Sequence, residues 1–285
     1  MNAIEVKQLS KSFQDHLVLE NIDLIVEQKE IFGLLGPSGA GKTTLIKALC
    51  SQLQYVGSAH VFGMEARDHQ GDILKLIGMS LDQDGFYHRL SVWDNLCFFA
   101  KLHEVSKERV MEVLKRVLLY EHRKTTVEKL SNGMKQRLSF AAAILHQPKL
   151  LFLDEPTNGL DPNTMNEIHD LIKELHASGT TIFLTTHNME EATKLCDHVA
   201  LLHEGNIIAY GTIPSLCATH QLYDHIRVHT LRHGVIELKN EPASAQFLGE
   251  LMKTKDIISI HSMEPDLRQV FMEMTKRKEN EHEGK

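Results

Sequence analysis

The segment GPSGAGKTT, residues 36–44, constrains the fold of this chain more than any other feature. It follows the apolar run IFGLL (Ile31–Leu35) and precedes TLIKALCSQL, which has the spacing of a helix. Glycine accepts backbone angles that other residues resist, so such a loop can turn successive N–H groups toward one centre. A strand that ends in this loop and leads directly into a helix predicts a site where an anion approaches the backbone closely.

The same segment satisfies the phosphate-binding pattern G-x-x-x-x-G-K-[ST], with Gly36, Gly41, Lys42 and Thr43 at the fixed positions. We expect loop N–H groups to surround phosphate oxygens, Lys42 to add a cation, and the Thr43 hydroxyl to ligate Mg²⁺. The ligand that this pattern predicts is a nucleoside triphosphate. The residues expected to contact its phosphates are Gly36, Pro37, Ser38, Gly39, Ala40, Gly41, Lys42, Thr43 and Thr44.

Two acidic residues follow another apolar stretch, KLLFLDEP, which predicts a buried strand ending at Asp154 and Glu155. Ligands of open α/β sheets bind beyond the carboxyl ends of the strands. We therefore expect Asp154 to hold Mg²⁺ through water and Glu155 to act as the general base on the attacking water. The alternative is that both are solvated loop acids, which the burial of the preceding run disfavours.

A histidine ends a further predicted strand, TIFLTTH, at position 187. An isolated histidine is more often structural or exposed. His187, however, follows a phosphate loop and a pair of carboxylates along the chain. We expect it to hold the γ-phosphate and to orient the attacking water.

Predicted strands alternate with predicted helices up to about Pro214, which favours an α/β fold with a parallel sheet wound by helices. The spacing becomes helical from Ser91 onward, with Ser91 and Ser106 as expected helix caps. After Pro214, short strands and helices predict a small α+β appendage over residues 216–275. The charged tail, residues 276–285, has no apolar face and is expected to be disordered.

Composition narrows the range of partners and compartments. The 285-residue chain has a formal net charge of −7 and a pI of about 6.2, which disfavours broad binding to nucleic acid. Its four cysteines form no CxxC pair and are expected to be reduced, in a cytosolic protein. No apolar run approaches the roughly 20 residues that span a bilayer, and the N-terminus lacks a signal-peptide pattern. We therefore expect a protein that is soluble by itself.

The segment LSNGMKQRL, residues 130–138, is similar to the LSGGQ signature of the ATP-binding cassette (ABC) family. The order of phosphate loop, signature, LLFLDEP, NGLDP and TTH resembles that family over about residues 3–215. The resemblance implies a P-loop NTPase fold (ABC ATPase) with a mainly parallel core sheet and an antiparallel β subdomain. Residues 1–215 would form this ATP-binding domain, with a helical insert at about residues 86–146.

The resemblance also implies ATP as the nucleotide, Mg²⁺ as the cofactor, and a homodimer in which each ATP lies between two subunits. Ser131 and the Gly133 N–H would bind the γ-phosphate held by the partner, and Asp161 would lie near the opposite site. The signature residues are Leu130, Ser131, Asn132, Gly133 and Met134, and the D-loop residues are Gly159, Leu160 and Asp161. Asn132 and Met134 depart from the common Gly and Gln, and we expect function to survive because Ser131 and Gly133 make the phosphate contacts.

Two further positions carry alternatives. Phe13 matches the aromatic that stacks on adenine in the family, with Val18 beside it, and the alternative is a simple aromatic at a strand edge. The family also has a glutamine in IGxxxQ that contacts Mg²⁺ and reports on the membrane partner. Counting from Gly78 places Asp82 at this Q-loop position, with Gln83 one step later, and both stay open.

In that family, a separate transmembrane permease is the partner of the ATPase subunit. We expect it to dock in a cleft lined by apolar and aromatic residues of the insert, since such a patch suits a protein partner. These residues are Phe86, Tyr87, Leu90 and Trp93. The alternative is that Trp93 and Phe98 form the core of the insert.

The function implied by the resemblance is that of an ATP-binding and ATP-hydrolysing subunit of an ABC transporter, peripheral on the cytoplasmic side of the cell membrane. LSxGMKQR resembles cassettes of drug and peptide exporters, so export of a drug, lipid or antimicrobial peptide is expected. One alternative is a non-transport cassette of DNA repair or of ribosomes. The other is a regulatory module that holds nucleotide without turnover. No nucleic-acid partner is expected.

Overall fold

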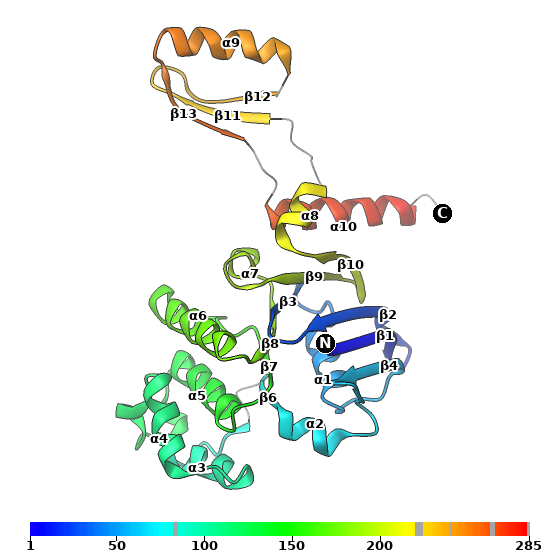
Figure 1. The fold of residues 1–285 in the computed structure, drawn as a ribbon, viewed down its shortest axis with the longest axis vertical. Helices are drawn as coiled ribbons and strands as arrows, with labels where there is room; N and C mark the ends of the chain where they lie inside the picture. Colours follow the sequence, from blue (N-terminus) through cyan, green and yellow to red (C-terminus); the bar gives the residue numbers. More distant parts are fainter. Residues whose placement is uncertain (82–84, 220–224, 240, 263–265, 284–285) are drawn as a thin grey trace. The chain divides into compact units, whose positions relative to one another are not determined.

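The computed structural model describes the chain except residues 82–84, 220–224, 240, 263–265 and 284–285. It contains two compact units, Met1–Tyr210 and Gly211–Lys285 (Figure 1). The sequence places this boundary after residue 215 and the structure places it after Tyr210.

The first unit is built on a six-stranded sheet with the strand order β10-β9-β3-β8-β7-β6. Its strands are β3 (Ile31–Leu35), β6 (Ile77–Ser80), β7 (Leu150–Asp154), β8 (Thr181–Thr186), β9 (His198–His203) and β10 (Asn206–Gly211). Strand β3 pairs in parallel with β8 and β9, and β7 pairs in parallel with β6 and β8. This sheet confirms the predicted α/β class with a mainly parallel core.

The two central strands of this sheet, β3 and β8, are buried along their length because both faces of the sheet are covered. Every residue of β3 and of β8 is buried. The rings of Phe32, Phe152 and Phe183 are fully buried. The Phe183 ring contacts both of the others, with centroids 5.1 Å from that of Phe32 and 5.4 Å from that of Phe152. Burial of each ring contributes roughly 1.5–3 kcal/mol. The strand ends that carry the polar motifs are therefore anchored in a close-packed core.

A second sheet of the first unit is antiparallel, with the strand order β2-β1-β4-β5. Its strands are β1 (Asn2–Phe13), β2 (His16–Glu27), β4 (Val56–Val61) and β5 (Met64–Glu65). Helix α1 (Lys42–Leu49) shares one buried cluster with this sheet, to which Ile4, Leu24 and Leu45 contribute. The predicted antiparallel β subdomain is thus present.

Helices cover the opposite side of the central sheet, where α5 and α6 lie in Figure 1. The helices of the first unit after α1 are α2 (Gln70–Leu76), α3 (Val92–Leu102), α4 (Lys107–Arg116), α5 (Asn132–Ile144), α6 (Pro162–Ala177) and α7 (Met189–Leu195), with 3₁₀ turns at Tyr120–His122 and Val127–Lys129. A second buried cluster joins Leu96, Leu114 and Leu138 of α3, α4 and α5. Ser91 and Ser106 cap α3 and α4 as predicted, because their hydroxyls accept from the Asp94 and Arg109 N–H groups.

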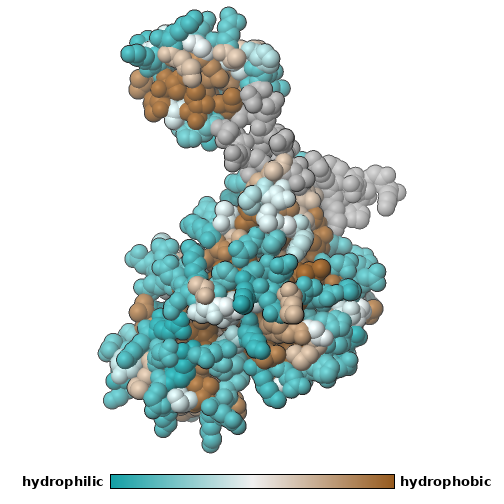
Figure 2. All heavy atoms as spheres, in the orientation of Figure 1, coloured by the Kyte–Doolittle hydropathy of each residue, from teal (hydrophilic) through white to brown (hydrophobic). Residues whose placement is uncertain are grey.

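The second unit combines a three-stranded sheet, ordered β12-β11-β13, with helices. Its elements are α8 (Ile213–Thr219), β11 (His225–Thr230), β12 (Gly234–Lys239), α9 (Pro242–Lys253), β13 (Ile257–Ser262) and α10 (Leu267–Glu283). Figure 2 shows apolar side chains gathered on part of this unit, whose exposed apolar residues include Phe247, Ile258 and Ile260. The α+β composition of the appendage matches the sequence prediction.

Helix α10 continues to Glu283, through most of the charged segment that the sequence predicts to be disordered. The helix starts on the buried residues Leu267 and Val270 and continues through the charged segment. Lysine and glutamate have high helix propensity, and adding residues to an existing helix costs little compared with nucleating one. An apolar face is therefore not needed for those last turns.

Candidate nucleotide site

The phosphate loop connects β3 to α1 and is shaped by glycines at positive φ. Gly39 and Gly41 have φ angles of 82° and 107°, which side chains with a Cβ rarely adopt. A Cβ on Gly41 would also lie 2.7 Å from Leu19 Cδ2 on β2. Only glycine at position 41 lets the loop pass this close to the antiparallel sheet and then enter the helix.

Lys42 lies inside this loop and is only 5% exposed. Its Nζ donates to the carbonyl oxygens of Gly36 and Pro37 at 2.9 Å and 3.0 Å. The same Nζ lies 3.3 Å from Glu155 Oε1. The ammonium group is therefore held in place by the loop itself before any phosphate is bound.

A pocket of about 600 Å³ opens above the loop. Its lining residues are Val18, Ser38, Gly39, Gly41, Lys42, Thr43, Thr44, Leu81, Gln136, Asp154, Glu155 and Asn158. This volume is in the usual range for small-molecule and cofactor sites. The pocket thus joins the phosphate loop to the carboxylates at the end of β7, which the sequence placed together.

Asp154, the last residue of β7, faces the first turn of α1. The Thr43 hydroxyl donates to Asp154 Oδ2 at 2.6 Å, and the Thr185 hydroxyl donates to Oδ1. A hydroxyl and a carboxylate this close supply the hard oxygen ligands that Mg²⁺ prefers. The residues present therefore match the predicted Mg²⁺ position at Thr43 and Asp154.

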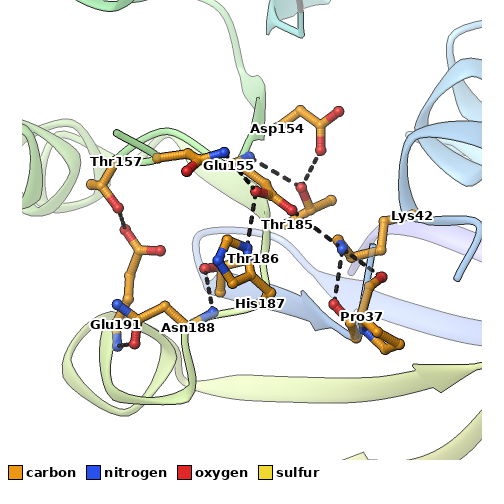
Figure 3. A network of polar contacts seen from close by, with 12 residues as sticks. Pro37, Lys42, Asp154, Glu155, Thr157, Thr185, Thr186, His187, Asn188 and Glu191 are labelled. Atoms are coloured by element: carbon orange, nitrogen blue, oxygen red, sulfur yellow. Dashed lines mark hydrogen bonds and ion pairs between the residues drawn. The ribbon is translucent and has the colours of Figure 1, made fainter. Parts of the chain in front are cut away.

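Glu155 receives hydrogen bonds from two further side chains, as Figure 3 shows in part. Glu155 Oε2 lies 2.9 Å from His187 Nδ1 and 3.2 Å from Asn158 Nδ2. Its φ of 47° lies in the left-handed region, where a non-glycine residue is uncommon and often marks a functional site. The Glu155 N–H donates to the Thr185 carbonyl at 3.0 Å, which fixes this bend against β8.

The signature segment begins helix α5. The Ser131 hydroxyl caps the helix by accepting from the Met134 N–H at 3.3 Å, while Leu130 is buried and Asn132 is exposed. A Cβ on Gly133 would lie 3.3 Å from Leu160 Cδ2, so the signature lies against the D-loop of its own chain. Ser131 is exposed at the positive end of α5.

The D-loop residues Gly159, Leu160 and Asp161 precede α6. Gly159 turns the chain with a φ of 71°. The Asp161 carboxylate caps α6, accepting from the Asn163 and Thr164 N–H groups at 3.1 Å each. The Thr164 hydroxyl and these N–H groups lower the pKa of Asp161 below its ordinary value. Asp161 is therefore an ionised, exposed residue at the edge of the site.

The two candidate adenine residues lie in different surroundings. Val18 lines the pocket, whereas Phe13 is not among its lining residues. Phe13 is 44% exposed, and Lys11 Nζ lies 4.8 Å from the centroid of its ring. Stacking of adenine on Phe13 stays a prediction. Asp82 and Gln83, the alternatives for the Q-loop position, lie outside the described residues.

Sequence patterns did not single out four residues that take part in the site. These are Leu81 and Gln136, which line the pocket, and Asn158 and Thr185, which bond to the two carboxylates. Asn158 and Thr185 belong to the motifs NGLDP and TTH, three residues after Glu155 and two before His187, but the motifs gave them no role. Their position at strand ends was a usable signal, but the pairing across β7 and β8 appears only in the fold.

The aromatic patch of the insert differs in part from its prediction. Phe86 is only 7% exposed and packs edge-on against Phe99, with ring centroids 5.7 Å apart, so it belongs to the core. Tyr87 and Leu90 are exposed. Trp93 lines a pocket of about 420 Å³ while packing against the buried cluster, and Phe98 is 42% exposed. The patch is therefore smaller than expected.

The chain is similar to known proteins of one family. A family model described as ABC transporter matches residues 19–158. The chain is 38% identical over 269 residues to a fluoroquinolones export ATP-binding protein of Mycobacterium tuberculosis (strain CDC 1551 / Oshkosh), covering 91% of this chain and 88% of that protein. It is 37% identical over 229 residues to a bacitracin transport ATP-binding protein of Enterococcus faecalis, covering 79% and 74%.

Solved structures show the same fold. One titled as the ATP-binding subunit of an ABC transporter superimposes with a TM-score of 0.71 at 28% identity, covering 77% of this chain and 94% of that one. A dimeric ATP-binding cassette in a post-hydrolysis state, bound to ADP and Pi, gives a TM-score of 0.69 at 22% identity, covering 73% and 98%. The latter likeness concerns the fold alone.

The fold and the loop between β3 and α1 define a P-loop nucleotide-binding protein. The sheet topology, the motif order and the extent of similarity to curated relatives specify it further. The chain belongs to the ABC transporter family and is an ATP-binding subunit of that family. Among the residues that the structure describes, no helix is both long and apolar enough to cross a membrane.

Proposed function

We propose that this chain binds and hydrolyses ATP with Mg²⁺, as one half of a homodimer that drives export through a separate transmembrane permease. The observation that carries the proposal is the convergence of Lys42 and His187 on the Glu155 carboxylate. Lys42 Nζ lies 3.3 Å from one oxygen and His187 Nδ1 lies 2.9 Å from the other. A cation for the phosphate (Lys42) and a side chain to orient water (His187) thus both contact a candidate base (Glu155).

The same geometry suggests what each residue does. The γ-phosphate would bond to the Lys42 ammonium, which the Gly36 and Pro37 carbonyls and Glu155 hold in place. Glu155 would then keep the bonds from His187 and Asn158 and accept a proton from the attacking water. Mg²⁺ held at Thr43 and Asp154 would neutralise charge on the phosphate oxygens.

The dimer is proposed because the predicted phosphate-binding residues of the signature lie outside the phosphate-loop pocket of the same chain. Ser131 lies exposed at the N-terminus of α5 and is not among the residues lining the phosphate-loop pocket. A helix N-terminus is a favourable place for a phosphate. In a head-to-tail pair, Ser131 and Gly133 of one subunit would reach the γ-phosphate held by the other, with Asp161 nearby.

Export is proposed from the names of relatives that cover most of this chain. They include proteins for fluoroquinolones export, bacitracin transport and linearmycin resistance. The chain would act at the cytoplasmic side of the membrane as a peripheral subunit, without a nucleic-acid partner. Tyr87, Leu90 and Trp93 are the residues proposed to meet the permease.

The test is to block hydrolysis and follow association. Glu155→Gln keeps the size and hydrogen-bonding capacity of the side chain but removes the general base. We expect ATP turnover to fall by at least about 100-fold, since general base catalysis contributes on that order. With saturating Mg-ATP, the variant should move from monomer to dimer when its mass is measured by light scattering after gel filtration.

The wild-type protein is the control for turnover, and Glu155→Gln without nucleotide is the control for association. Unaltered turnover in Glu155→Gln would refute the assigned base. A variant that binds Mg-ATP but stays monomeric, even together with its permease, would refute the shared active site.

A further inference from the structure

A buried carboxylate lies behind the catalytic residues. Glu191, in the first turn of α7, is 2% exposed. Its Oε1 accepts from the Thr157 hydroxyl at 2.6 Å and lies 3.1 Å from His169 Nε2. Thr157 and His169 are themselves buried, at 5% and 4% exposure. Burying a carboxylate is costly unless hydrogen bonds compensate, so this cluster calls for an explanation.

The cluster of Glu191, Thr157 and His169 draws on three different parts of the fold. Thr157 lies in the loop after β7, two residues beyond Glu155. His169 lies on α6, the helix that Asp161 of the D-loop caps. Glu191 itself lies on α7, which begins just after His187 (Figure 3). One carboxylate therefore ties together the segments that carry the proposed base, the D-loop and the histidine.

The connection to His187 is short and made of polar contacts. Asn188, the cap of α7, accepts from the Glu191 N–H at 3.3 Å, and its own N–H donates to the Thr186 hydroxyl at 3.0 Å. Burial alone would raise the pKa of Glu191, but bonds from His169, Thr157 and Thr186 together lower it. These bonds favour the charged carboxylate, and one of the bonding residues, Thr186, directly precedes His187.

A small cavity separates this cluster from the reaction centre. It has a volume of about 170 Å³ and is lined by residues of all three segments, among them Glu155, Thr157, Leu160, His187 and Glu191. A movement of any one segment would change this space directly. Side chains that line this cavity lack packing contacts on the cavity side, so contacts on their other sides must fix their positions.

We propose that Glu191, with Thr157 and His169, is a positioning cluster that fixes His187 and Glu155 relative to the D-loop helix. It does not touch nucleotide and acts through the residues that do. The inference rests on the proposed function, because it concerns the rate of the same hydrolysis. Loss of the cluster would misplace the base and the histidine while the phosphate loop, on β3 and α1, keeps its nucleotide contacts.

The test separates turnover from nucleotide binding in the full-length protein. Glu191→Gln removes the charge but keeps the shape, and we expect kcat for ATP to fall about tenfold with KM changed less than about twofold. Thr157→Val removes one hydroxyl and should lower kcat in the same way but less. The matched control is Glu190→Gln, which makes the same change at the exposed neighbouring position of α7. It should leave both constants unchanged.

A rescue pair tests positioning against simple loss of stability. His169→Gln retains an N–H donor for Glu191 and should keep more of the wild-type kcat than His169→Leu. Wild-type kcat in Glu191→Gln, Thr157→Val and His169→Leu, even with lowered melting temperatures, would overturn the inference and leave the proposed function standing. Absence of ATP turnover in the wild-type protein would overturn both.

Discussion

Lys42 has partners of two kinds within the site. Its ammonium bonds to the Gly36 and Pro37 carbonyls and lies beside the Glu155 carboxylate. The ammonium group does not have to lose water when phosphate enters, because Lys42 is already buried. The cost of desolvating the cation is therefore met during folding, and the ammonium is ready for a phosphate.

We accordingly expect Lys42→Ala to weaken ATP binding strongly. A hydrogen bond to a charged group contributes about 1.5–3 kcal/mol, which corresponds to a dissociation constant raised roughly 10- to 100-fold. Calorimetric titration with Mg-ATP measures this change. Lys47→Ala, in the last turn of the same helix, removes a lysine outside the pocket lining and should bind ATP as the wild type does. Equal affinity of Lys42→Ala and wild type would contradict the prediction.

Residues with fixed local spacing could be located from the sequence, whereas residues paired through the fold could not. Lys42 and Thr43 belong to one continuous pattern, and Asp154 and Glu155 follow one apolar run. Glu191, by contrast, meets Thr157 and His169 across 34 and 22 positions of chain. No periodicity within α6 or α7 distinguishes a histidine or glutamate that is buried in a bonded pair from one in solvent.

At the scale of elements, a pair of histidines joins helices α3 and α5 to strand β6. His103, the C-cap of α3, stacks on His146 just after α5, with ring centroids 4.1 Å apart and planes at 8°. His146 Nε2 lies 2.9 Å from the Ile77 carbonyl and so donates, while Nδ1 is buried and has no hydrogen-bond partner among the described residues. A second proton on His146 would therefore be buried without an acceptor.

The histidine pair predicts a pH dependence of folding. Burial lowers the pKa of both rings below the ordinary value of 6.5, and His103 lowers that of His146 further. The unfolded chain then binds more protons than the folded one, so this contribution to stability is complete above about pH 6.5 and is lost as the pH falls. Each such histidine contributes at most about 1.4 kcal/mol per pH unit.

Urea unfolding at several pH values between 7.5 and 5.5 measures this slope. His146→Gln keeps a donor for the Ile77 carbonyl but does not titrate, so its stability should depend less steeply on pH than that of the wild type. His122→Gln, outside the stacked pair, is the matched control and should retain the wild-type slope. An unchanged slope in His146→Gln would show that the pair does not titrate on unfolding.

Element types followed from the sequence more readily than element ends. The buried run of β7 and the capped helices α3 and α4 have sequence patterns that fit only one type of secondary structure. The stretch DILKLIGMSLD did not, because α2 gives way to β6 between Leu76 and Ile77, and the nearby Gly78 lies inside the strand. Pairing of β6 with β7 decides the change there, and such pairing is not a local property.

At the scale of the whole molecule, the first of the two units contains both large buried apolar clusters. Both large buried clusters draw all their residues from positions 4–207, within the unit Met1–Tyr210. The proposed nucleotide site and the Glu191 cluster lie within the same unit. A unit that holds its own core and site can fold by itself.

We therefore expect a fragment of residues 1–212, which keeps all of β10, to fold and to bind ATP. It should unfold in one cooperative transition by circular dichroism, since its apolar clusters are complete. Its dissociation constant for Mg-ATP should stay within about threefold of that of the full chain, a difference below 1 kcal/mol. A fragment that aggregates, or that melts without a cooperative transition, would show that Gly211–Lys285 supplies part of the stability of the first unit. A folded fragment that lost ATP would instead place a nucleotide contact in the second unit.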